Sequence, residues 1–239
     1  MPRLQGRPPV YQREQQVRGG GQEGQNLQEE ERAVKRAKTH HPAYRAVVIG
    51  GSAGGAKALG VILSALPGDF ALPVFAVQHL HQRDGGSFAL HMAGVTPLPV
   101  VEPCDKDRIE HGRVYIAPAN YHMLVERDGT IALSVDERVN WSRPSIDVLF
   151  ESAALAWGEA VVAVILTGSN ADGAKGMRAV REAGGLTIAQ DPASAEYPVM
   201  PQAAIDTGAV DEVLRVEEIG RRVSLAWREG KAVIRLTTY

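Results

Sequence analysis

The feature that most constrains the fold of this chain is a strand–turn–helix pattern. Residues 46–49 are Ala-Val-Val-Ile, and three of the four are β-branched, which is typical of a short buried strand. The strand leads into Gly-Gly-Ser-Ala-Gly-Gly at residues 50–55, and a helix is expected over 56–66. The glycines predict a sharp turn with Ser52 at its apex, in a G-x-S-x-G frame. Such a turn lifts a hydroxyl out of the sheet, where a substrate and backbone amides can approach it.

The turn alone leaves two interpretations of Ser52 open. The serine is either a nucleophile or the N-cap of a helix in a phosphate-binding or structural turn. A dinucleotide-binding G-x-G-x-x-G pattern does not fit, because its second glycine would fall on Ser52 or on Ala53. The choice therefore depends on whether the rest of the chain supplies a base.

Strands and helices alternate from residue 44 onward, and this alternation predicts the fold class. Residues 160–166 form a seven-residue apolar run, typical of a central parallel strand covered on both faces. A helix is expected over 146–157, with Leu149 and Leu155 among the residues that it buries. We predict an α/β fold with a doubly wound, mostly parallel sheet and helices on both faces, in three αβα layers. Further strands are expected at 73–79, 99–102, 112–118 and 186–190, further helices at 87–92, 174–183, 198–209 and 216–227, and a small β-hairpin at 123–134.

The first 42 residues have a composition unlike the rest. They hold seven glutamines, and eight Lys and Arg against five carboxylates give an excess of three positive charges. Such a segment cannot bury enough apolar surface to offset its chain entropy. We predict a disordered polar tail over 1–42 and one folded domain over 43–239.

Charge and cysteine content narrow the possible functions. A net charge of -2 argues against a nucleic-acid-binding surface over the whole fold. The single cysteine, Cys104, excludes an intramolecular disulfide and a zinc site built on several cysteines. Neither an apolar run of about 18 residues nor a secretory signal is present, so membrane insertion is not expected. We expect a cytoplasmic protein, and no spacing typical of a metal or cofactor site is found.

Three polar residues each follow a predicted strand: Ser52, His79 and Asp172. In a doubly wound sheet, catalytic groups gather at the carboxyl ends of the strands. An imidazole can take the serine proton, and a carboxylate on its other nitrogen fixes the tautomer. Each residue also has a structural interpretation, as a cap, a strand-end histidine or a turn aspartate, but together they favour a triad. Competing histidines are His81, His91, His111 and His122.

The order of these residues along the chain disfavours one class of serine hydrolase, the enzymes of the α/β-hydrolase fold. Enzymes of the α/β-hydrolase fold have the order serine, acid, histidine. Here the order is Ser52, His79, Asp172, so an ordinary esterase or lipase fold is a poor match.

The motifs around these residues resemble the catalytic domain of CheB-type chemotaxis protein-glutamate methylesterases. The resemblance runs in family order over about 44–230. It rests on Val-Ile-Gly-Gly-Ser-Ala-Gly-Gly (48–55), Val-Gln-His-Leu (77–80), Ile-Ala-Pro (116–118), Tyr-His (121–122), Arg-Pro-Ser-Ile-Asp-Val-Leu-Phe (143–150), Leu-Thr-Gly (166–168), Ala-Asp-Gly-Ala-Lys-Gly-Met (171–177), Met-Pro (200–201) and Ala-Ala (203–204).

The resemblance implies a function and a role for each residue. Ser52 would be the nucleophile, His79 the general base and Asp172 the orienting acid, with no metal and no cofactor. The implied reaction hydrolyses γ-glutamyl methyl esters on the cytoplasmic helices of methylated chemoreceptors and releases methanol. Family members also deamidate receptor glutamines. Residues 43–239 would then be a methylesterase-like catalytic domain.

The chain departs from the family pattern at several positions. Ala53 stands where members usually have threonine, and Ser169 and Asn170 replace the methionine and second glycine of a Thr-Gly-Met-Gly stretch. These departures keep an alternative open, a catalytically weak or inactive binding module of the same fold in a receptor signalling pathway. Residues 1–42 are too short and too polar for the phospho-receiver domain of regulated members. The resemblance therefore implies a constitutive enzyme or one controlled by a separate regulatory protein.

Some roles stay open at this stage. Arg143 either steers an acidic receptor helix or pins its own loop, and His122 either lines the cleft or is structural. A transition-state oxyanion needs N–H donors. The candidates are the backbone amides near Ala53, Gly54, His79 and Ser169.

Overall fold

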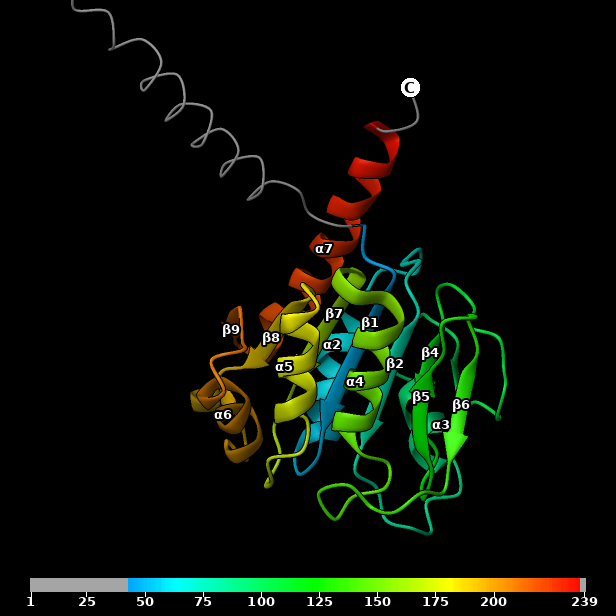
Figure 1. The fold of residues 1–239 in the computed structure, drawn as a ribbon, viewed down its shortest axis with the longest axis vertical. Coiled ribbons are helices and arrows are strands. Elements are labelled where there is room, and N and C mark those ends of the chain that lie inside the picture. The colour runs from blue at the N-terminus through cyan, green and yellow to red at the C-terminus, as the bar shows by residue number, and fades with distance from the viewer. Residues whose placement is uncertain (1–42, 237–239) are drawn as a thin grey trace, which may run out of the picture. The chain divides into compact units, whose positions relative to one another are not determined.

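The computed structural model describes residues 43–236 (Figure 1). The polar tail expected at 1–42 lies outside the described residues and stays a prediction. The described part is built on a seven-stranded parallel sheet in the order β3-β4-β2-β1-β7-β8-β9. Its strands are β1 (Ala46–Gly51), β2 (Val74–Gln78), β3 (Val100–Val101), β4 (Val114–Ile116), β7 (Val161–Ile165), β8 (Leu186–Gln190) and β9 (Glu212–Leu214).

Helices cover both faces of this sheet, and each face has its own core. In Figure 1, α4 and α5 lie in front of the sheet and α2 lies behind it. Alternate residues of β1 point to opposite cores, Val47 and Ile49 to one and Ala46 and Val48 to the other. One core takes in α2 (Gly55–Ser64), α3 (Ser87–Ala93) and α7 (Val216–Leu236); the other takes in α4 (Ile146–Trp157), α5 (Ala174–Glu182), α6 (Val199–Asp206) and the antiparallel hairpin β5 (His122–Val125) and β6 (Ile131–Ser134).

The predicted α/β fold, with its parallel sheet between two helical layers and its small hairpin, is confirmed. Helix α4 and strand β8 have the predicted bounds, whereas α7 continues past the predicted residue 227 to Leu236. Two short 3-10 turns, Gly158–Ala160 and Pro192–Ser194, were not predicted.

One predicted core residue is wrong. Leu155 is 70% exposed, while Leu149, Phe150 and Ala153 of the same helix are buried. Leu155 follows Leu149 by six positions, which at about 100° per residue turns it to the solvent side. Helical periodicity identified the helix, but only the packed position of α4 on the sheet decides which leucine is covered.

The strand order places a ligand site at one edge of the sheet. From β1 the chain continues to β2 on one side, whereas β7, on the other side of β1, leads on to β8. Connections therefore leave in opposite directions at the β1–β7 boundary, where a crevice opens at the carboxyl ends of the strands. Ser52 follows β1 there, His79 follows β2 and Asp172 lies in the loop after β7.

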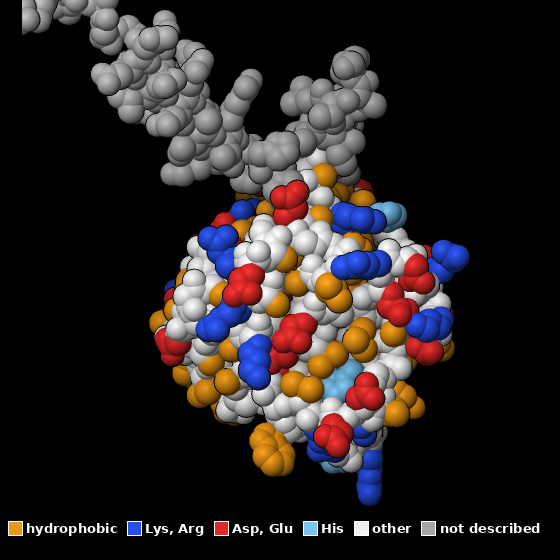
Figure 2. Space-filling model, viewed as in Figure 1, with side chains coloured by type: hydrophobic (Ala, Val, Ile, Leu, Met, Phe, Trp, Pro, Cys, Tyr) orange, Lys and Arg blue, Asp and Glu red, His pale blue; other side chains and the backbone are white. Residues whose placement is uncertain are grey.

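The surface carries charges of both signs. On the face shown in Figure 2, Lys and Arg side chains are interspersed with Asp and Glu, without one large region of a single sign. Within residues 43–236, no helix combines the length and the apolar composition that crossing a bilayer requires.

The two leucines of α4 give a matched test of the core. Replacement Leu149→Ala should lower the free energy of unfolding by about 2–5 kcal/mol, because it leaves a cavity in a packed interior. Leu155→Ala on the same helix should change it by no more than about 0.5 kcal/mol. Urea denaturation of both variants measures the difference, and equal losses would mean that the assigned buried face is wrong.

Candidate active site

The turn that carries Ser52 is held by backbone bonds that extend the parallel sheet. Ser52 N–H donates to Thr167 O at 3.0 Å, and His79 N–H donates to Gly51 O at 3.1 Å. Gly54 then takes a left-handed conformation, with φ of 74°, and caps α2. Glycine adopts this conformation without the cost that a side chain adds. The hydroxyl is thereby fixed between the ends of β2 and β7.

Gln78, which sequence analysis did not single out, anchors the same turn. Its buried Nε2 donates to Ser52 O at 2.7 Å. A Cβ atom at position 55 would lie 2.3 Å from Gln78 Oε1, so glycine at that position lets the amide reach the serine carbonyl. The signals in the sequence were its place directly before His79, at the end of an apolar strand, and its membership of the Val-Gln-His-Leu segment (77–80).

The structure brings the three candidate residues together in one hydrogen-bonded chain. Ser52 Oγ lies 3.2 Å from His79 Nδ1, and His79 Nε2 lies 2.8 Å from Asp172 Oδ2. With the imidazole proton on Nε2, the ring donates to Asp172 and accepts the Ser52 hydroxyl proton at Nδ1. The His79 side chain is 15% exposed and that of Asp172 is fully buried, so the imidazole connects the surface to a buried carboxylate.

Asp172 accepts hydrogen bonds on both carboxylate oxygens. Besides His79, Oδ2 accepts from Ile146 N–H at 2.7 Å, while Oδ1 accepts from Ser145 Oγ at 2.8 Å and from Asn140 Nδ2 at 2.9 Å. Burial by itself raises the pKa of Asp172, but these hydrogen bonds outweigh it, and the pKa falls below its ordinary value. The carboxylate also faces the first turn of α4, where the helix dipole favours negative charge. Asp172 is therefore a stable anion next to His79.

A second buried carboxylate, Asp147, lies beside the first. Asn140 Nδ2 donates to Asp147 Oδ2 at 2.7 Å and to Asp172 at 2.9 Å, so one amide bridges the two acids. Asp147 Oδ1 accepts from Gly176 N–H of α5 at 2.8 Å. Burial raises the pKa of Asp147, and the nearby charge of Asp172 raises it further. The two neighbouring carboxyls thus differ in their tendency to hold a proton.

The other four histidines that the structure describes do not join the site, and His122 is structural. Buried His122 accepts from Ser145 N–H at Nδ1 and donates to Glu137 O from Nε2. It therefore supports the serine that contacts Asp172. His81 Nδ1 accepts from the N–H of Arg83, and the His111 ring bonds to Ala71 O; exposed His91 lies on α3.

Arg143 pins its own loop. Its Nη1 donates to the carbonyl oxygens of Val135 and Asp136.

Of the amides considered for an oxyanion, His79 N–H already donates to Gly51 O. The N–H groups of Ala53, Gly54 and Ser169 have no acceptor among the described residues, so they remain free to bind a ligand.

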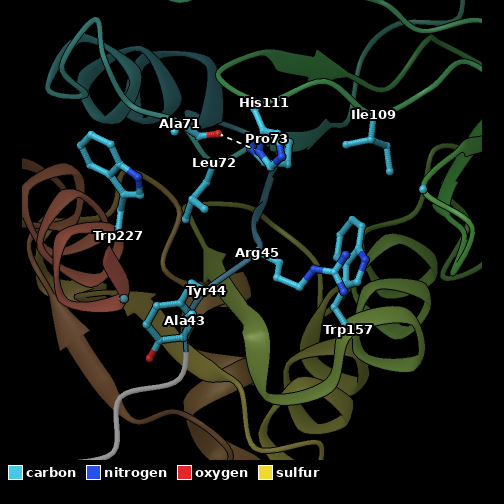
Figure 3. Close-up of a pocket in the computed structure, with 12 residues that line it drawn as sticks. Ala43, Tyr44, Arg45, Ala71, Leu72, Pro73, Ile109, His111, Trp157 and Trp227 are labelled. Atoms are coloured by element: carbon cyan, nitrogen blue, oxygen red, sulfur yellow. Dashed lines mark hydrogen bonds between the residues drawn. The ribbon is translucent and has the colours of Figure 1, made fainter. Parts of the chain in front are cut away.

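A cavity lies at the end of the sheet opposite to Ser52 and His79 (Figure 3). It has a volume of about 400 Å³ and is lined by residues that precede β1 and β2, such as Tyr44 and Leu72, together with Trp157. Ser52 and His79 follow those strands, so this cavity lies away from the hydrogen-bonded chain. Among the residues that the structure describes, no group of three His, Cys, Asp or Glu is arranged to hold a metal ion.

Comparison with known proteins identifies the family. The family model described as CheB methylesterase matches residues 47–223. The chain belongs to the CheB methylesterase family. The hydrogen-bonded chain of Ser52, His79 and Asp172 lies inside the matched region.

Individual relatives agree with this assignment. A Leptospira interrogans protein named putative protein-glutamate methylesterase/protein-glutamine glutaminase is 46% identical over 176 residues, which are 74% of this chain and 91% of that protein. A Geobacter metallireducens relative of the corresponding name is 42% identical over 75% of this chain, but over only 51% of its own length. The crystal structure of the Thermotoga maritima CheB methylesterase catalytic domain superposes with a TM-score of 0.73 at 33% identity, covering 76% of this chain and 97% of that one.

The bridging role of Asn140 can be tested without disturbing the backbone. Asn140 has a φ of 50°, which glycine also adopts, so Asn140→Gly removes the amide alone. The variant removes the Asn140 bond to Asp147 Oδ2 and one of the bonds to Asp172 Oδ1, which keeps Ser145 and Asp147 N–H as donors. We expect the free energy of unfolding to fall by about 2 kcal/mol, as for other hydrogen bonds to charged groups. Urea denaturation measures the loss, and an unchanged midpoint would contradict the bridge.

The charge of Asp172 predicts a pH-dependent stability. Its folded pKa lies below the unfolded value of about 3.9, so its contribution is present above about pH 4 and is lost as the pH falls through the folded pKa. The difference in unfolding free energy between wild type and Asp172→Asn should therefore shrink as the pH falls below about 4. Urea denaturation across this range measures it. A difference that grows on acidification would show that the pKa is shifted the other way.

Proposed function

We propose that this protein is a serine hydrolase that removes methyl esters from γ-glutamyl side chains on the cytoplasmic helices of chemoreceptors. The observation that carries the proposal is the continuous hydrogen-bonded path from Ser52 Oγ through His79 to the buried Asp172 carboxylate. The Leptospira relative's name supports the substrate class. The same name supports deamidation of protein glutamines as a second activity.

Ser52 is the nucleophile in this mechanism. As Oγ attacks the ester carbonyl carbon, His79 Nδ1 takes the hydroxyl proton, and a tetrahedral intermediate forms. The negative charge on the former carbonyl oxygen needs donors, each worth about 2.7–4 kcal/mol in comparable sites. The free N–H groups of Ala53, Gly54 and Ser169 are the candidates for that role.

His79 and Asp172 complete both half-reactions. The imidazolium returns its proton to the methoxy oxygen as the C–O bond breaks, which releases methanol and leaves an acyl-serine. His79 then takes a proton from water, whose oxygen attacks the acyl carbon, and the proton returns to Ser52 Oγ as the glutamate leaves. Asp172 remains charged throughout and stabilises each imidazolium, in keeping with its lowered pKa. A cytoplasmic location and control by a separate regulatory protein belong to the same proposal.

Methanol release from methylated receptor fragments tests the reaction. Ser52→Ala should lower the rate by about four orders of magnitude or more, because the hydroxyl forms the bond to the substrate. Ser64→Ala is the matched control, since Ser64 is an exposed serine on α2 that bonds only to Val61 O. Equal release by wild type and Ser52→Ala would refute the proposal.

A fluorophosphonate probe separates catalysis from binding. Wild type should be labelled stoichiometrically at Ser52, because the probe reacts with an activated serine. A protein that binds methylated receptor but takes up no label would instead be a binding module of the same fold, the alternative raised by Ala53 and Ser169.

A further inference from the structure

A tight turn next to the triad carries an unusual residue. Val139 N–H donates to Ser142 O at 3.2 Å and Ser142 N–H to Val139 O at 2.9 Å, which closes a two-residue loop. Both loop residues are left-handed, with φ of 50° at Asn140 and 63° at Trp141, as in a type I′ turn. Asparagine tolerates this conformation, but a bulky tryptophan rarely adopts it.

The Trp141 side chain is 93% exposed, the highest value among the large hydrophobic side chains that the structure describes. Left-handed backbone at a residue of this kind costs free energy and persists only where the surroundings hold it. Exposed tryptophan is also costly, and it is enriched among the residues that dominate protein–protein binding. Packing against the described residues does not account for the choice of residue at this position.

The turn is rigidly tied to the candidate active site. Asn140, directly before Trp141, donates to both Asp172 and Asp147. Trp141 itself lines a depression of about 160 Å³ together with His79 and Arg143. The backbone that carries the indole is therefore held beside His79, and a preorganised backbone loses little entropy on binding.

The charges around the depression indicate what it would accept. Arg138 and Arg143 both line it, and within residues 43–230 neither has a carboxylate at ion-pairing distance. Unpaired cations beside an exposed indole complement a surface that carries apolar and acidic side chains together. A helix with an apolar stripe flanked by Glu or Asp has that composition.

We propose that Trp141 is the docking anchor for a helical protein substrate. The indole packs on the apolar stripe of the helix, Arg138 pairs with its carboxylates, and the glutamyl ester is held over Ser52. The inference rests on the proposed function and deepens it, because it names the residue that distinguishes a receptor helix from a small ester.

The test compares two substrates. Trp141→Ala should lower kcat/KM for methylated receptor fragments about thirtyfold, as expected for loss of an interface anchor, mainly through KM. The ratio of receptor turnover to p-nitrophenyl acetate turnover should fall by at least tenfold. Trp141→Phe should restore most of the ratio. Leu155→Ala is the control, because Leu155 is another exposed apolar residue, on α4, and this variant should leave the ratio unchanged. An unchanged ratio in Trp141→Ala, or equal loss on both substrates, would overturn the proposal.

A binding measurement separates failure of docking from failure of chemistry. The inactive Ser52→Ala protein should bind methylated receptor fragments, and adding Trp141→Ala should weaken the Kd about thirtyfold. Such weakening supports docking even if wild type releases no methanol, a result that would refute only the proposed reaction. Equal Kd values for the two proteins would refute the anchor whatever the activity of wild type.

Discussion

The site depends on one physical constraint, the burial of the Asp172 charge. A carboxylate withdrawn from water is tolerated only if hydrogen bonds replace its hydration. Five donors do so: His79, Ile146 N–H, Ser145, Asn140 and Asp147 N–H. Four of the five come from the segment that forms the exposed turn and starts α4. The same anion therefore fixes the histidine, the start of a core helix and the turn beside the cleft.

Close packing of two helices makes this arrangement possible. A Cβ atom at Gly176 would lie 2.5 Å from Phe150, so only glycine lets α5 approach α4 this closely. The approach brings Gly176 N–H to Asp147, which in turn shares Asn140 with Asp172. The loop that carries Asp172 is thus fixed at both ends, by β7 and by the contact of α5 with α4.

The sequence sufficed for those features that have a local signal. Apolar runs and glycine turns predicted the strands, the helices and the position of Ser52, and the strand ends pointed to His79 and Asp172. Gln78 and Asn140 were missed because their roles are hydrogen bonds to Ser52 O and to two buried carboxylates, which neither apolar periodicity nor a strand end signals. No periodicity records such a contact. The prediction for Leu155 was wrong for a different reason, because its spacing of six residues from Leu149 places the two leucines on different sides of α4, and packing on the sheet covers only the Leu149 side.

The exposed turn and the hydrogen-bonded chain of Ser52, His79 and Asp172 are physically coupled. Asn140 and Trp141 are the two residues of one left-handed turn, so the backbone that holds the amide against Asp172 also carries the indole. A substrate that binds Trp141 would therefore contact the same segment of the chain that donates hydrogen bonds to the buried Asp172 carboxylate. Because the amide bridges two carboxyls with oppositely shifted pKa values, movement of this turn would change the hydrogen bonds of both. In the proposed docking mode, recognition of the substrate and orientation of His79 thus depend on the same segment of the chain, residues 139–147.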